Sequence, residues 1–176
     1  IFRGKDYLIN ISGILAEGGI SMENPSVAVV IVAGGKGTRM GRSQNKLLLP
    51  LGNSTILGQT VAVWQKIPLV QTIVIVCAPG EKEQVAEICR QQQITKLRQI
   101  VIGGKERQDS VWQGLTYLAT CAEKPAYVAI HDGARPFYQG SQFGQFYQAV
   151  REAQAPGGVL AVPVQDTIKT VCGPMV

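Results

Sequence analysis

The stretch Val27–Ala33 (VAVVIVA) decides the fold class. Seven apolar residues in succession, most of them β-branched, are typical of a strand that is buried on both faces. A glycine-rich stretch, Gly34–Gly41, follows it directly. We therefore expect Val27–Ala33 to be an interior strand of a parallel sheet, with a tight loop at its carboxyl end.

The rest of the chain alternates strand and helix patterns. Further strands are predicted at Thr72–Cys77, Arg98–Ile102, Tyr127–Ile130 and Gly158–Val164, and helices at Thr55–Lys66, Glu81–Gln92, Ser110–Cys121 and Gln142–Ala153. Thr55 is a candidate N-cap, and Ser110 with Gln113 fits a capping box. Such alternation requires parallel strands joined by right-handed crossovers, so the sequence predicts a three-layer α/β domain with a mostly parallel sheet.

Composition excludes several classes of protein. The chain has 176 residues, 45% hydrophobic and 16% charged, so it can bury its own core and is not a disordered segment. No apolar run approaches the roughly 20 residues of a membrane helix. Four scattered cysteines and one histidine argue against a disulfide framework and a zinc site. The formal charge of +5, gathered in loops, favours an anionic small molecule over a nucleic acid.

The two ends differ from the middle of the chain. Residues 1–21 show no clean periodicity and no secretory signal, and Met22 precedes the first clear strand. We expect 1–21 to be an upstream or non-native leader and 22–176 to be the domain. Because Thr170–Val176 stops inside what reads as a hairpin, we also expect the domain to be incomplete at its C-terminus.

The loop after the first strand has the composition of a phosphate-binding site. Glycines let backbone N–H groups surround a phosphate, while Arg39 can fork onto its oxygens and Lys46 can add a point charge. It is not a Walker A loop, because the required Gly-Lys-Ser/Thr is absent, and it is not the dinucleotide fingerprint, because Gly37 and Gly41 are separated by three residues. The alternative is an ordinary glycine-rich turn. Against it, the loop carries several basic residues and no acidic residue that could pair with them.

Three more loops follow predicted strands, at the sheet edge where open α/β domains bind ligands. The glycines before Ser110 favour close ligand approach, but taken alone this loop is better explained as a helix cap after a turn. Asp132 ends a strand and is a natural Mg²⁺ ligand. Thr167 and Lys169, after the last predicted strand, could donate to a second phosphate.

Together the four loops resemble those of one family. The motifs read Ala33-Gly34-Gly35-Lys36-Gly37-Thr38-Arg39-Met40-Gly41 with Asn45-Lys46-Leu47, Gly103-Gly104-x-x-Arg107-x-x-Ser110-Val111, His131-Asp132-x-x-Arg135-Pro136, and Ala161-Val162-Pro163-Val164-x-Asp166-Thr167-Ile168-Lys169. In this order they are similar to the 2-C-methyl-D-erythritol 4-phosphate cytidylyltransferases, CTP-dependent enzymes of the non-mevalonate isoprenoid pathway. Ribitol-5-phosphate cytidylyltransferases share the first three motifs, and the fourth favours the methylerythritol enzymes.

The resemblance implies a Rossmann-like nucleotidyltransferase domain that transfers a cytidylyl group from CTP to methylerythritol phosphate. It implies that Arg39 and Lys46 are catalytic cations that stabilise the α-phosphate, and that Thr167 and Lys169 bind the acceptor. It also implies that Gly104, the backbone of Lys105, and Ser110 read the cytosine edge. Further nucleotide contacts are implied for Ala33, Gly34, Gly35, Gly37, Asp132 and Arg135. Asp132 would hold Mg²⁺ or another divalent cation.

The resemblance further implies a homodimer, formed through a β-arm, in the cytoplasm or, in a plant or alga, in the plastid stroma. Because the family continues past the position of Val176, we expect this chain alone to bind CTP weakly and to catalyse poorly. Two rival classes remain open. A GT-A-type glycosyltransferase would need an Asp-x-Asp motif, which the chain lacks. A non-catalytic nucleotide-binding module would bind CTP without releasing pyrophosphate.

Overall fold

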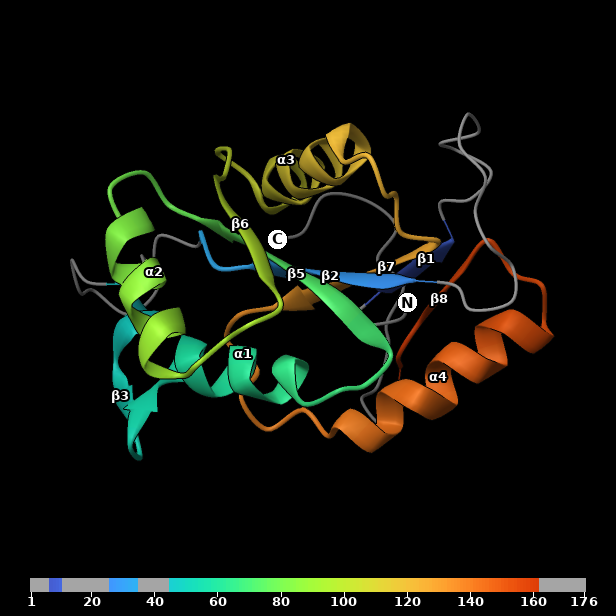
Figure 1. Cartoon of the computed structure of the whole chain (residues 1–176), viewed down its shortest axis with the longest axis horizontal. Helices are drawn as coiled ribbons and strands as arrows, with labels where there is room; N and C mark the ends of the chain where they lie inside the picture. The colour runs from blue at the N-terminus through green and yellow to red at the C-terminus, as the bar shows by residue number, and fades with distance from the viewer. Residues whose placement is uncertain (1–6, 11–25, 35–44, 162–176) are drawn as a thin grey trace, which may run out of the picture.

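Six strands form one sheet, in the order β6-β5-β2-β7-β1-β8, in a computed structural model that describes residues 7–10, 26–34 and 45–161 (Figure 1). The strands are β1 (Tyr7–Asn10), β2 (Val27–Val32), β5 (Val70–Cys77), β6 (Leu97–Ile102), β7 (Tyr127–Asp132) and β8 (Gly157–Val159). A separate hairpin pairs β3 (Pro50–Leu51) with β4 (Ser54–Thr55).

The sheet is mostly parallel, as predicted. Strands β6, β5, β2 and β7 run in one direction. Strand β1 is antiparallel to both of its neighbours, so β8 runs in the same direction as β7. The run that begins at Val27 forms β2 in the interior of the sheet, and every residue of β2 except Val32 is buried.

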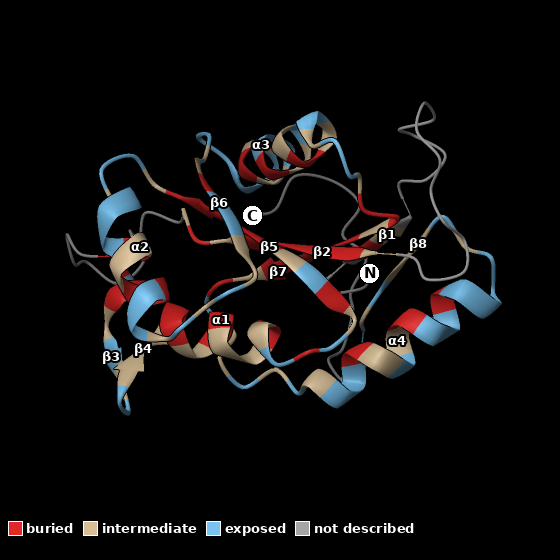
Figure 2. Cartoon of the chain, in the orientation of Figure 1, coloured by how far each residue is buried: buried red, intermediate tan, exposed pale blue. Residues whose placement is uncertain are grey.

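Helices cover both faces of the sheet and complete three layers (Figure 1). Helices α1 (Ile56–Gln65), α2 (Lys82–Gln91) and α4 (Gly140–Glu152) pack on one face, and α3 (Arg107–Thr120) packs on the other. Successive side chains of β2 alternate between these faces, so Val29 belongs to the first core and Val30 to the second. Figure 2 shows the buried residues concentrated on the strands and the inner sides of the helices. Within the described residues, no helix has the length and apolarity needed to span a bilayer.

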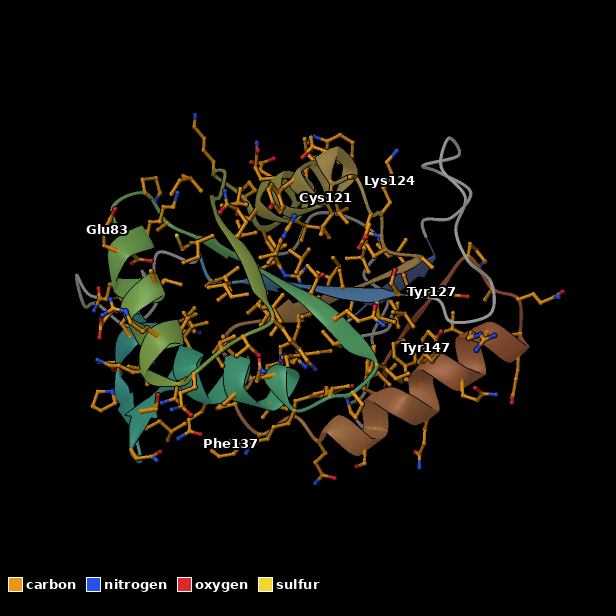
Figure 3. All side chains as sticks on the ribbon, in the orientation of Figure 1. Glu83, Cys121, Lys124, Tyr127, Phe137 and Tyr147 are labelled. Carbon is orange, nitrogen blue, oxygen red and sulfur yellow. The ribbon has the colours of Figure 1, made fainter. Side chains whose placement is uncertain are left out.

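Aromatic contacts attach α4 to the sheet. Tyr147 of α4 meets Tyr127 of β7 edge to face, with ring centroids 5.2 Å apart (Figure 3). Phe143 of α4 meets Trp64 of α1 in the same manner, also at 5.2 Å. Each such pair contributes about 0.5–1.5 kcal/mol beyond area burial. These contacts hold α4 against β7 and α1.

The predicted start of α3 is wrong. The helix begins at Arg107 rather than at Ser110, so Ser110 with Gln113 is not its capping box. The backbone N–H of Glu106 donates instead to the carboxylate of Asp109 at 3.0 Å. An acid inside the first turn thus satisfies the helix terminus. At α1 the predicted cap is confirmed, since Oγ1 of Thr55 accepts from the N–H of Gly58.

Two strands near the chain ends also differ from expectation. Strand β8 ends at Val159, short of the predicted Gly158–Val164, whose last three residues lie outside the described part. Strand β1 was not predicted, although it lies between β7 and β8 with Leu8 fully buried. Four residues are too few for an alternation pattern to be recognised. The interpretation of residues 1–21 as a leader stays a prediction.

The contact between α3 and the sheet depends on a glycine, which gives a testable prediction. A Cβ at Gly114 would lie 2.5 Å from Cγ1 of Val30. We expect Gly114→Ala to lower the free energy of unfolding by about 1–2 kcal/mol, because overpacking outweighs the better helix propensity of alanine. Urea denaturation measures this. The control is Gly144→Ala in α4, where a Cβ meets nothing within 4 Å and stability should hold or rise. Equal losses in both variants would contradict the packing argument.

Candidate functional site

The carboxyl ends of β2, β5, β6 and β7 meet at one edge of the sheet, because these strands are parallel. Backbone hydrogen bonds join the loops that leave this edge. The N–H of Gly103 donates to the carbonyl of Cys77 at 2.9 Å, and the N–H of Gly133 donates to the carbonyl of Val32 at 2.9 Å. The loops that the sequence analysis singled out one by one therefore begin on a common surface.

Asn45 fixes the position of Lys46 at this edge. Its side-chain amide donates to the carbonyl of Ala33 at 3.1 Å and to Oε2 of Glu81 at 2.9 Å, while its Oδ1 accepts from the N–H of Leu47. Asn45 is 8% exposed, whereas Lys46 is exposed. The buried amide of Asn45 thus holds the backbone turn, and the side chain of the next residue, Lys46, is exposed to solvent.

This positioning role of Asn45 was missed by the sequence analysis, which quoted the residue only within a motif. A signal was available. Asparagine is a favoured N-cap, and it stands directly before the short 3₁₀ helix Lys46–Leu48, whose leucines are buried. The partner of its amide nitrogen could not be foreseen, because Glu81 lies 36 residues further along the chain.

Asp132 ends β7 and lies opposite Val32 in the register with β2. Two arginines flank its carboxylate. Arg107, from the start of α3, approaches Oδ1 with its Nε at 2.9 Å and a terminal nitrogen at 2.8 Å. The Nε of Arg135 lies 3.6 Å from Oδ2. The Asp132 side chain is 20% exposed, so the group is both paired and open to solvent. The sequence analysis quoted Arg107 in a motif but gave it no role.

The loop between β6 and α3 has no space for a side chain at one of its glycines. A Cβ at Gly104 would lie 2.3 Å from the Cβ of Asp109. Ser110 is 3% exposed, and its hydroxyl donates to the carbonyl of Glu106 at 3.2 Å. In this structure Ser110 supports the loop from beneath, while Gly104 and Lys105 are exposed.

The other candidate residues divide into two groups. The structure places Ala33, Gly34, Gly104, Lys105, Asp132 and Arg135 on strand ends and loops at the carboxyl edge, Lys46 in the short 3₁₀ helix and Ser110 in the first turns of α3. Outside the described residues lie Gly35, Gly37, Arg39, Thr167 and Lys169. The described half of the site is therefore the part that surrounds Lys46 and Asp132.

The donor set at this edge fits Mg²⁺ better than a closed metal centre. Among the residues that the structure describes, no three histidine, cysteine or carboxylate groups converge. A single carboxylate such as Asp132 suits Mg²⁺, which is commonly held by one or two carboxylates together with substrate phosphates and water. Cys77, at the end of β5, is poorly suited as a metal ligand. Burial, and after it the negative charge of Glu81, raises the pKa of its thiol and so disfavours the thiolate that would bind a metal.

An open, mostly parallel sheet with glycine-bearing loops, cations and one carboxylate at its carboxyl edge defines an α/β domain of the nucleotidyltransferase type. Solved structures agree on this fold. A crystal structure of a 4-diphosphocytidyl-2C-methyl-D-erythritol synthase matches with a TM-score of 0.66 and 23% identity, over 86% of this chain and 66% of that one. The synthase from Anaerococcus prevotii matches with a TM-score of 0.59 and 23% identity, over 77% and 55%.

Sequence comparison is more specific. The family model described as 2-C-methyl-D-erythritol 4-phosphate cytidylyltransferase matches residues 27–176, and the chain belongs to this family. A relative of that name from Halalkalibacterium halodurans is 41% identical over 146 residues, covering 83% of this chain and 61% of the relative. One from Alkaliphilus metalliredigens is 42% identical over 146 residues, covering 82% and 58%. The chain thus spans about three-fifths of the length of these relatives.

Proposed function

We propose that the protein containing this chain transfers the cytidylyl group of CTP to 2-C-methyl-D-erythritol 4-phosphate. The products are CDP-methylerythritol and pyrophosphate, and the reaction serves isoprenoid precursor synthesis. One observation carries the proposal. Lys46, the Gly104 loop and Asp132 all lie at the same edge of the sheet, in a chain that belongs to this family.

The chemistry of the proposed reaction explains the cations. An oxygen of the acceptor phosphate attacks the α-phosphorus of CTP, and the bond to the departing pyrophosphate breaks in line. The nucleophile is already an anion, so no general base is needed. The barrier is the meeting of two polyanions, which fixed positive charges reduce. Lys46 supplies one such charge from a backbone that Asn45 holds in place. Arg39, which lies outside the described residues, is proposed to supply another.

Base recognition is assigned to the loop before α3. Gly104 and Lys105 are exposed, so their backbone N–H and carbonyl groups are available to the edge of a cytosine ring. A Cβ at Gly104 would collide with Asp109, so glycine is needed for the backbone course that leaves Gly104 and Lys105 exposed. Ser110 stabilises this loop through its bond to Glu106.

Asp132 would hold Mg²⁺ or another divalent cation, which when bound supplies positive charge to the phosphate oxygens. We expect Asp132→Asn to raise the Mg²⁺ concentration for half-maximal activity about tenfold, because a neutral amide is a much weaker ligand. Pyrophosphate release measured against Mg²⁺ concentration tests this. The control is Glu123→Gln, an exposed acid in the connection after α3, which should not shift the titration. The same titration for Asp132→Asn and the unaltered protein would exclude Asp132 as a ligand.

The assignment of function is tested by pyrophosphate release from CTP and Mg²⁺, with the product of the complete reading frame that encodes this chain. Release that requires methylerythritol phosphate supports the proposal. Release only with ribitol 5-phosphate would assign a different acceptor. CTP binding without release by any sugar phosphate would favour a non-catalytic nucleotide-binding module.

We also propose that the complete protein is a homodimer in the cytoplasm and has no nucleic-acid partner. The support is the family to which the chain belongs. Light scattering after size-exclusion chromatography tests the dimer.

A further inference from the structure

Arg107 connects two parts of the site that are far apart in the sequence. It is the first residue of α3, directly after the glycine loop, and its guanidinium reaches Asp132 at the end of β7. Its Nε and a terminal nitrogen approach the same carboxylate oxygen, Oδ1, at 2.9 Å and 2.8 Å. Two N–H groups therefore occupy the oxygen that a metal ion would use.

The second carboxylate oxygen also faces a positive charge. The Nε of Arg135 lies 3.6 Å from Oδ2 of Asp132. A Mg²⁺ ion bonds a carboxylate oxygen at about 2.1 Å, so at either oxygen it would stand within a few ångströms of a guanidinium. Like charges at that separation repel even in a partly solvated site. A cation would therefore bind Asp132 more tightly once Arg107 had moved away from Oδ1.

The ion pair between Arg107 and Asp132 can be broken at a small cost in stability. The side chains of Arg107 and Asp132 are 40% and 20% exposed, and pairs with this much solvent contact contribute little to stability. The start of α3 does not depend on the pair, because Asp109 accepts from the N–H of Glu106. Packing of Leu118 against the sheet holds the far end of the helix.

We propose that Arg107 is a displaceable counter-cation of Asp132. It pairs with the carboxylate while no metal is bound, and it moves away when a divalent cation binds. The inference rests on the proposed function, since it takes Asp132 as the metal ligand. Arg107 is then a positioning residue, and its charge lowers the metal affinity of the free protein. Because it directly follows the proposed base-binding loop, it also joins that loop to the metal ligand Asp132.

Mn²⁺ binding to the nucleotide-free protein tests the proposal, with free Mn²⁺ followed by electron paramagnetic resonance. Arg107→Gln removes the charge, and we expect it to bind Mn²⁺ about fivefold more tightly than the unaltered protein. The matched control is Arg98→Gln, which removes the same charge from an exposed residue near the amino end of β6 and should leave the Kd unchanged. Arg107→Lys keeps the charge and should also leave it unchanged.

Asp132→Asn separates the failure of this inference from failure of the proposed function. If Asp132 is the ligand, this variant binds Mn²⁺ more weakly, and the double variant with Arg107→Gln loses the fivefold gain. Weakened binding in Asp132→Asn with no gain in Arg107→Gln would overturn the counter-cation role alone. Unchanged binding in Asp132→Asn would overturn the ligand assignment and the counter-cation role together. A gain in Arg107→Lys equal to that in Arg107→Gln would show that charge is not the cause and would also overturn it.

Discussion

Replacement of Lys46 by alanine is expected to lower kcat about 100-fold while KM changes much less. Removal of one preorganised donor from a site of charge development costs roughly 3 kcal/mol. The effect falls on kcat because negative charge at the α-phosphate is greater in the transition state than in bound CTP. The structure fixes the backbone from which this side chain extends, since Asn45 bonds to Ala33 and to Leu47 on either side of Lys46.

The measurement is the steady-state rate of pyrophosphate release at saturating CTP and acceptor, with the complete protein. Lys66→Ala is the matched control, because Lys66 is an exposed lysine that follows α1 and its loss changes the net charge equally. We expect the control to keep the rate of the unaltered protein. A Lys46→Ala variant with an undiminished kcat would remove Lys46 from the catalytic machinery, and a raised KM alone would make it a nucleotide-binding residue.

Much of the fold could be predicted from the sequence, because its patterns have direct physical causes. The β-branched run at Val27 is continuous since β2 is buried on both faces. Thr55 caps α1 because its hydroxyl reaches the N–H of Gly58. The start of α3 was mistaken because serine is the commoner cap, whereas here Asp109 reaches the helix terminus from inside its first turn. Strand β1 is too short for a pattern and precedes the family match, which begins at residue 27.

The candidate site was proposed residue by residue, and its contacts could not be foreseen. Lys46 and Asp132 were proposed from the loops in which they stand, and their roles stay predictions. The partners that hold them were not identified. Arg107 and Asp132 are 25 residues apart, and their pairing depends on which strands the sheet places side by side. Tertiary contacts of this kind leave no periodicity in a single sequence.

Asn45→Asp is expected to lower the free energy of unfolding by about 3 kcal/mol at neutral pH, a magnitude typical of a buried polar group left without its partner. The variant keeps an oxygen that can accept from Leu47, so that bond is retained. It loses the amide nitrogen that donates to Ala33 and Glu81, and it places a second carboxylate against that of Glu81. Urea denaturation measures the loss. The control is Asn53→Asp, an exposed site whose Oδ1 only accepts from Gln59, where we expect a change below about 0.5 kcal/mol.

A second substitution distinguishes charge repulsion from simple loss of shape. In the double variant Asn45→Asp with Glu81→Gln, the new amide can donate to the new carboxylate, which restores a hydrogen bond with its direction reversed. We expect most of the lost stability to return, because the bond is restored and the repulsion between two carboxylates is removed. The double variant should also recover kcat, since Lys46 would again be held in place. A double variant as unstable as the single one would mean that the bond to Ala33, rather than the bond to Glu81, is the contact that positions Lys46.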